Sequence, residues 1–267
     1  MQENTPFHSL SSSRPSYYSD MITSTKTKTK TPPTSLIPKD APMIDTVYED
    51  NHLIAINKRS GDIVQGDKTG DAPLSEIIKE HLKSKYDKPG AVYLGVVHRI
   101  DRPVTGIVIF AKTSKALSRM NELFREKKVK KTYWAVVKNA PPEESGTLIH
   151  YLKKDEAKNK SKAYTEEVSG SSRSWLDYKI IGKSDNYYLL EINPHTGRHH
   201  QIRAQLAAIG CPIKGDLKYG FDRSNKDGSI HLHARKIEFV HPVKKEEMVI
   251  IAPAPDDAVW NFFSLHQ

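Results

Sequence analysis

Apolar residues recur at helical spacing in three parts of the chain. The first runs from residue 71 to residue 82, with Asp71 expected as the N-cap and Pro73 in the first turn. Residues 114–126 give the clearest amphipathic pattern, since their apolar and charged positions lie on opposite sides of a helix. A third helix is expected over about residues 198–209, where Gly210 would end it.

Shorter apolar runs, continuous or alternating, predict strands. Residues 45–57 have the pattern of a hairpin or paired strands, and residues 107–111 that of a buried strand. Strands outnumber helices and do not alternate regularly with them, so the sequence favours an α+β domain around an antiparallel or mixed sheet. The remaining predicted strands are 133–137, 146–152, 175–182, 187–192 and 230–240.

The first 42 residues differ in composition from the rest of the chain. They are rich in Ser, Thr, Lys and Pro and lack apolar periodicity, which predicts a disordered basic tail over residues 1–42. Residues 43–267 are then expected to form one globular domain. An organellar transit segment, or a true start at Met21 or Met43, is an alternative interpretation of the tail.

Charge and cysteine content restrict the partners and the compartment. The formal charge of +9 favours a polyanion, either a nucleic acid or an acidic membrane surface. The single cysteine, Cys211, excludes an intramolecular disulfide and any zinc site that needs two thiolates, and cytoplasm is the expected compartment. No stretch approaches the roughly 18 consecutive apolar residues of a membrane span, so no transmembrane segment is expected. Of the two kinds of polyanion, a nucleic acid rather than a membrane is the expected partner.

The segment HRIDRPVTG at residues 98–106 places one carboxylate, Asp101, between Arg99 and Arg102. A carboxylate beside fixed positive charge stays ionised at pH 7 and is able to act as a nucleophile, a base or a cation ligand. The guanidinium fork matches phosphate oxygens, which suggests chemistry on a nucleic acid. A strand entry with a surface ion pair is the alternative interpretation.

Two further segments combine basic residues with other functional side chains. Lys131 precedes Tyr133 on a predicted strand whose alternation points Tyr133 and Trp134 to opposite faces. An aromatic ring beside lysines is able to stack a nucleobase, although for this segment taken alone a place in the core is the favoured interpretation. Around Arg198 a strand is expected to end and a helix to begin, and the N-terminus of a helix attracts anions. Arg203 lies one turn later, near the buried side of that helix, and a partly buried cation needs a carboxylate partner, for which Asp101 is the best candidate.

Histidines offer a competing metal-site hypothesis. His195 and His199 have i,i+4 spacing, but the arginines at 198 and 203 would repel a divalent cation. On the late strand, Leu232 faces away from its neighbouring histidines and is expected in the core. The full set is His195, His199, His200, His231 and His233.

Together these segments resemble the RluA-type pseudouridine synthases over about residues 44–252. The resemblance is carried, in order, by HRIDRPVTG at 98–106, KTY at 131–133, TGRHHQIR at 196–203, GDLKYG at 215–220 and LHA at 232–234. One departure lies in the early segment NKRSG, where Arg59 replaces the proline of the N-K-P-x-G loop of that family. The tail also leaves no room for the small RNA-binding domain that many members carry.

The resemblance implies a pseudouridine synthase fold, with a mixed and mostly antiparallel sheet and flanking helices. It implies a monomeric enzyme that isomerises uridines of ribosomal or transfer RNA without cofactor or metal. Asp101 would be the nucleophile, Tyr133 would stack on the flipped uracil, and Arg203 would pair with Asp101. Leu232 would form the floor of the pocket, and Arg99 would fill the space that the base vacates or hold the backbone.

The same resemblance places His98, Arg102, Lys131 and Arg198 among the residues that bind substrate. Whether Asp101 attacks the sugar or the base stays open. Two alternative functions also remain: a catalytically silent RNA-binding protein of the same fold, which the presence of Asp101 argues against, and a histidine-rich, metal-dependent hydrolase.

Overall fold

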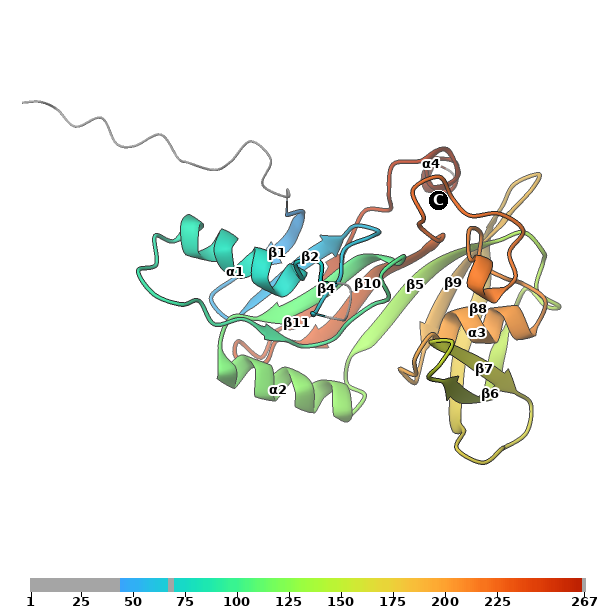
Figure 1. Ribbon diagram of the computed structural model, residues 1–267, viewed down its shortest axis with the longest axis horizontal. Helices are drawn as coiled ribbons and strands as arrows, with labels where there is room; N and C mark the ends of the chain where they lie inside the picture. The colour runs from blue at the N-terminus through green and yellow to red at the C-terminus, as the bar shows by residue number, and fades with distance from the viewer. Residues whose placement is uncertain (1–43, 67–69, 266–267) are drawn as a thin grey trace, which may run out of the picture. The chain divides into compact units, whose positions relative to one another are not determined.

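The computed structural model describes residues 44–66 and 70–265, and the predicted tail over residues 1–42 lies outside them (Figure 1). Within the described residues the strands form one mixed sheet in the order β1-β2-β4-β10-β5-β9-β8-β6-β7, with β3 paired to β4 and β11 paired to β10. This architecture confirms the expected α+β class. The strands are β1 Thr46–Glu49, β2 Leu53–Lys58, β3 Gly95–Val96, β4 Thr105–Ala111, β5 Lys130–Val137, β6 Ser145–Asp155, β7 Lys160–Tyr164, β8 Ser172–Lys183, β9 Tyr188–Pro194, β10 Leu232–Val240 and β11 Glu247–Ile251.

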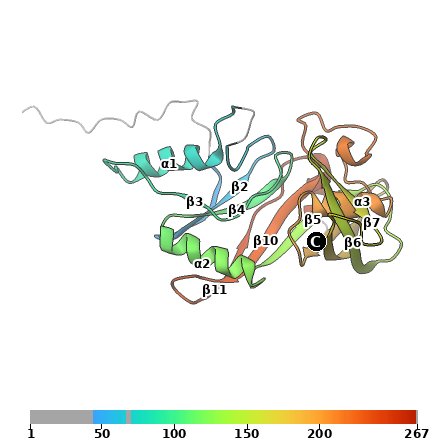
Figure 2. The same cartoon turned by 60° about the horizontal axis from the view of Figure 1, so that its bottom comes forward.

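Helices cover both faces of this sheet, and Figure 2 shows α1 and α2 on opposite sides of it. The alternation of β4 explains the two layers, because successive side chains of a strand point to opposite faces. Val108 and Phe110 belong to the core cluster beneath α1, whereas Ile107 and Ile109 belong to the cluster beneath α2. The helices are α1 Leu74–Lys85, α2 Ser114–Arg125, α3 Gln201–Ala208 and α4 Ala258–Leu265, with a 3₁₀ turn η1 at Leu217–Tyr219.

The second helix matches its sequence prediction, and the first begins later than expected. In α2, the Thr113 hydroxyl caps the helix by accepting the Ala116 N–H at 3.1 Å. In α1, Pro73 rather than Asp71 is the N-cap residue, so the prediction for Asp71 is wrong. The Asp71 carboxylate instead contacts the Arg102 guanidinium at 2.7 Å.

The third helix is shorter than the pattern suggested, because it begins at Gln201 rather than near residue 198. His200 has φ 52°, a left-handed conformation that cannot continue a right-handed helix. The Gln201 side chain accepts the Arg198 N–H at 3.0 Å and so stabilises the turn before the helix. Helix α4 and strands β7 and β11 were not predicted. No helix among the described residues is long and apolar enough to cross a bilayer.

Two of the sequence motifs meet where β4 and β10 run parallel. Gly106, the last residue of HRIDRPVTG, pairs with Ala234 of LHA, and Thr105 pairs with His233. Gly106 has φ +108°, and a Cβ atom there would overlap the backbone of Ala234. The glycine is therefore required for the close approach of these two strands.

We expect Gly106→Ala to lower the free energy of unfolding by about 2 kcal/mol or more, because it combines backbone strain with overlap in the core. Urea unfolding followed by circular dichroism measures this loss. Gly90→Ala is the matched control, since its Cβ would meet no atom within 4 Å. Equal stability of the two variants would contradict the role given to Gly106.

Candidate active site

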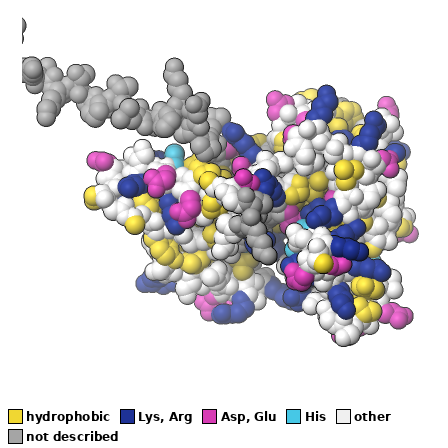
Figure 3. Space-filling model, in the orientation of Figure 1, with side chains coloured by type: hydrophobic (Ala, Val, Ile, Leu, Met, Phe, Trp, Pro, Cys, Tyr) yellow, Lys and Arg dark blue, Asp and Glu magenta, His cyan; other side chains and the backbone are white. Residues whose placement is uncertain are grey.

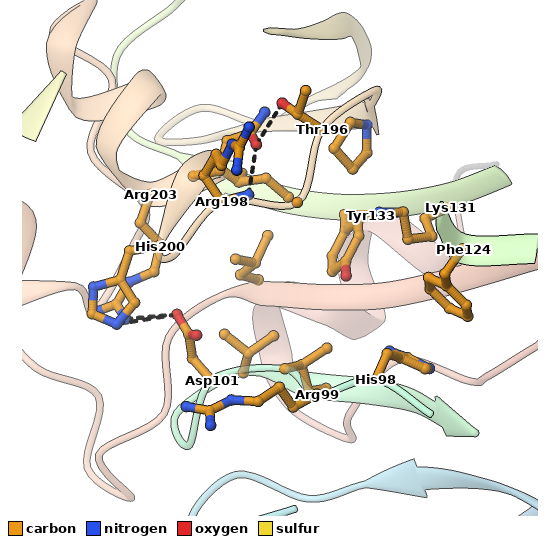
Figure 4. Close-up of a pocket in the computed structure, with 17 residues that line it drawn as sticks. His98, Arg99, Asp101, Phe124, Lys131, Tyr133, Thr196, Arg198, His200 and Arg203 are labelled. Atoms are coloured by element: carbon orange, nitrogen blue, oxygen red, sulfur yellow. Dashed lines mark hydrogen bonds and ion pairs between the residues drawn. The ribbon is translucent and has the colours of Figure 1, made fainter. Parts of the chain in front are cut away.

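A cavity of about 340 Å³ lies between the segment that precedes β4, the C-terminal part of α2, strand β5 and the start of α3 (Figure 4). Of the predicted site residues, Arg102 alone does not line it. The guanidinium of Arg102 is bound to Asp71, and Arg102 borders a neighbouring hollow instead. The predicted residues that line the cavity are His98, Arg99, Asp101, Lys131, Tyr133, Arg198, Arg203 and Leu232.

The Asp101 carboxylate is held in place by donors but remains accessible from the cavity. Its Oδ2 atom accepts a hydrogen bond from the Arg203 guanidinium at 2.9 Å, and His200 Nε2 lies 3.5 Å from the same oxygen. The Asp101 side chain keeps 30% of its surface exposed. The pairing of Arg203 with Asp101 that the sequence suggested is therefore present.

Arg203 has a second carboxylate partner that sequence reasoning missed. Its Nε and NH2 atoms donate to the two oxygens of Asp216 at 2.7 Å and 2.9 Å, a two-pronged contact. Both side chains are almost wholly buried. Burial opposes the charge on Arg203, but Asp216 and Asp101 together raise its pKa. The GDLKYG turn, which supplies Asp216, was the available signal.

His200 is a second side chain beside the Asp101 carboxylate, and it was also missed. Burial lowers the pKa of His200 to about 3, so its ring is neutral at pH 7. Tyr219 accepts the Ser161 N–H at 2.9 Å, and its hydroxyl lies 3.0 Å from His200 Nδ1. The Tyr219 hydroxyl thereby helps to orient the His200 ring, with Nε2 on the side of Asp101.

Tyr133 and Trp134 take opposite faces of β5, as the alternation predicted. The Tyr133 ring lines the cavity, where burial raises the pKa of its hydroxyl and keeps the phenol neutral. Trp134 packs with Trp260 of α4 on the other face, and the Arg235 guanidinium lies 4.3 Å from its ring centroid. The core interpretation therefore applies to Trp134 and not to Tyr133.

Leu232 and Lys131 complete two walls of the cavity. Leu232 is buried and lines the cavity, while its neighbour His233 points away and binds the Thr105 hydroxyl at 2.8 Å. Burial lowers the pKa of Lys131, and no carboxylate in the described residues pairs with its amine. The cavity thus has an apolar wall and a cation available to an anionic group.

A buried lysine holds the NKRSG loop next to the segment that contains Asp101. Lys58 Nζ donates to the carbonyl oxygens of Arg59, Asp62 and Arg102 at 2.7, 2.9 and 3.0 Å. Burial lowers the pKa of Lys58 to about 8, so the amine still carries its charge at pH 7. This lysine holds the NKRSG loop against the residue that follows Asp101.

The histidines on which the metal hypothesis rested have other partners. His195 Nε2 lies 2.6 Å from Asp177, and the His199 ring stacks on the His200 ring at 3.8 Å. His98 stacks on Phe124, and burial lowers its pKa to about 3. No three His, Cys, Asp or Glu residues gather as a potential metal site in the part of the chain that the structure describes.

Comparison with known proteins agrees with this geometry. Residues 52–208 match the family model of RNA pseudouridylate synthases. The chain belongs to this family. It is an RNA pseudouridine synthase, and therefore an isomerase.

Two relatives and one solved structure show the extent of the similarity. The tRNA pseudouridine synthase C of Vibrio parahaemolyticus is 30% identical over 231 residues, which cover 80% of this chain and 91% of the relative. The ribosomal large subunit pseudouridine synthase C of Vibrio vulnificus is 34% identical over 243 residues, covering 87% and 73%. The structure of human RNA pseudouridylate synthase domain containing 4 shares the fold, with a TM-score of 0.68, 23% identity and coverage of 83% and 92%.

We expect Asp216→Asn to lower the free energy of unfolding at pH 7 by about 3 kcal/mol or more, because it leaves Arg203 buried with half of its charge partners. Asp222→Asn is the control, since Asp222 forms an exposed pair with Lys138. That change should cost under about 1 kcal/mol. Urea unfolding compares the two variants, and similar small losses would show that Asp216 does not hold Arg203.

Proposed function

We propose that this enzyme converts uridines of ribosomal or transfer RNA to pseudouridine and that Asp101 is its nucleophile. The observation that carries the proposal is that Asp101 is the one carboxylate lining the cavity among the described residues. Named relatives modify transfer RNA in one case and the large ribosomal subunit in another, which supports both RNA classes as candidates.

The reaction breaks the bond between ribose C1′ and uracil N1 and forms one between C1′ and C5. A proton leaves C5 and N1 gains one, so the nucleotide keeps its formula and nothing is oxidised. Attack by Asp101 on the sugar and attack on the ring both satisfy this balance. In either case the carboxylate must be ionised and aimed at the nucleotide, which the hydrogen bond from Arg203 supports.

The cavity walls fit a uracil that has left its stack. Tyr133 would lie against one face of the base, and Leu232 would form the floor. Arg99 is exposed at the cavity and has room to fill the gap in the RNA or to hold its backbone. The arrangement suits an RNA enzyme better than a silent binding protein, because binding alone does not require a buried Arg203 beside a carboxylate.

Cations around the cavity would bind the RNA backbone. Lys131 and Arg198 line it with Arg99, and Figure 3 shows Lys and Arg side chains gathered along the hollow between the part that carries α1 and α2 and the part that carries α3. Phosphate contacts supply affinity and position the RNA. Arg102 would contact RNA outside the cavity.

We propose that the enzyme acts as a monomer. We place its catalytic domain at residues 43–267, since the sheet extends from β1 at Thr46 to β11 at Ile251. A cytoplasmic location agrees with the lone Cys211, which is buried and unpaired.

We expect Asp101→Asn to abolish isomerisation while RNA affinity stays within a few fold, because phosphate contacts are unchanged. The substrate is cellular RNA tritiated at uracil C5 from cells that lack the gene, and tritium release measures turnover. Asp222→Asn, which changes an exposed acid outside the cavity, is the control and should retain activity. Turnover by Asp101→Asn would contradict the assignment.

A further inference from the structure

We propose that Trp175, with Lys127, Arg173 and His195 around it, forms a second RNA-binding site that stacks an unpaired base next to the target uridine. The proposal rests on the proposed function, because it takes RNA as the substrate. It concerns a surface beside the cavity, to which none of the sequence motifs assigned a role.

Trp175 lies on the outward side of β8. Its neighbours Ser174 and Leu176 are buried, whereas Arg173 is exposed and shares the outward side with Trp175. The Trp175 ring is half-buried, so part of it remains available to a ligand. A large aromatic ring in this position has the geometry of a stacking surface rather than that of a core residue.

Cations surround this ring. Lys127 Nζ lies 4.7 Å from the ring centroid, and the Arg173 guanidinium lies 5.2 Å from it. Neither cation has a carboxylate partner among the described residues. The nearby acid, Asp177, is occupied by the His195 ring and the Thr147 hydroxyl, both at 2.6 Å. The site therefore keeps a positive charge that complements a phosphate backbone.

The backbone of Trp175 is joined to the wall of the cavity. The Thr196 hydroxyl accepts the backbone N–H of Trp175 at 3.1 Å, and Gln201 Nε2 donates to the backbone carbonyl of Trp175 at 3.1 Å. Thr196 and Gln201 both line the cavity. On the other side, Lys127 lies just beyond the C-terminus of α2, and its backbone N–H donates to the carbonyl of Phe124, another lining residue, at 3.2 Å. A base on Trp175 is therefore close enough to belong to the same RNA segment as the target.

The same outward face continues across the neighbouring strands. On β6, Ile149 is paired with Trp175 of β8 and is 47% exposed. Two residues farther along β6, Tyr151 is paired with Tyr164 of β7. Lys162 Nζ lies 4.8 Å from the Tyr164 ring centroid. Apolar and aromatic surface interspersed with lysine is typical of a path for single-stranded RNA.

The chemistry of base flipping favours this occupant. When the target uridine leaves its stack, the adjoining bases lose a stacking partner. A ring next to the cavity restores that contact for one of them, while Lys127 and Arg173 turn toward its phosphates. An acidic protein partner would use the cations but would have no need of the indole.

A second aromatic cluster provides a matched comparison. Tyr86 also has lysines around its ring, at 4.8 Å for Lys112 and 5.5 Å for Lys85. There, however, Glu49 pairs with both lysines at 2.7 Å. Glu49 thereby offsets part of the charge at Tyr86, where Lys88 also lies 5.8 Å from the ring centroid. Tyr86 lies outside the cavity, so Tyr86→Ala is the control for Trp175→Ala.

Tryptophan fluorescence tests the stacking directly. The chain has three tryptophans, and Trp134 and Trp260 are only 6% and 2% exposed, so quenching by a ligand should come from Trp175. We expect single-stranded oligoadenylate to quench the emission and inorganic polyphosphate and polyglutamate to leave it unchanged. Equal quenching by polyphosphate would show that the site recognises phosphate charge and not bases. Quenching by polyglutamate alone would show that it binds an acidic protein. Either result would overturn the proposal.

Turnover on tritiated cellular RNA gives the second measurement. We expect Trp175→Ala to raise KM about 10-fold, as loss of one base–aromatic contact should, with kcat within about twofold. Trp175→Phe should restore most of the affinity, and Tyr86→Ala should have the KM of the natural chain. If Trp175→Ala does not fold, Trp175→Leu, which keeps an apolar side chain without an aromatic face, and the pair Lys127→Ala and Arg173→Ala carry the test.

An unchanged KM in folded Trp175→Ala would overturn the stacking site. Failure of the stacking site can be distinguished from failure of the proposed function. Asp101→Asn should still show quenching by oligoadenylate, because it leaves Trp175 intact. If the natural chain releases no tritium from any cellular RNA, the proposed RNA classes and nucleophile are wrong, whatever the quenching shows.

Discussion

The buried contact between Arg203 and Asp216 is the constraint on which the rest of the site depends. It fixes a helix, α3, to the turn at residues 215–220 and leaves one guanidinium nitrogen free for Asp101 at 2.9 Å. An arginine this deeply buried is stable only with carboxylate partners. Asp216 satisfies most of that requirement, so Asp101 can remain partly exposed and available to a substrate while still being oriented.

The other motifs supply the geometry around that contact. Gly106 allows β4 to approach β10, which brings Leu232 to the floor of the cavity. Lys58 holds the carbonyl of Arg102, next to Asp101, from the opposite side. Segments far apart in the sequence therefore meet at one carboxylate, and each contributes a contact that a local sequence pattern does not reveal.

Sequence reasoning succeeded where local periodicity decides the structure. The helix around Met120 and the opposite facing of Tyr133 and Trp134 follow from spacing alone. It failed at Asp71 and at the start of α3, because a proline cap and the left-handed His200 depend on local backbone geometry. Asp216 was missed as a partner of Arg203 because a buried pair depends on tertiary packing, and charge type alone pointed to Asp101 as the best candidate.

The most direct test of the account is a map of pseudouridines in ribosomal and transfer RNA from cells of three kinds: cells with the natural gene, cells without it, and cells that carry only Asp101→Asn. The account predicts that a defined set of uridines is modified in the first and stays unmodified in the other two. Modification of those same uridines in cells that carry only Asp101→Asn would contradict it.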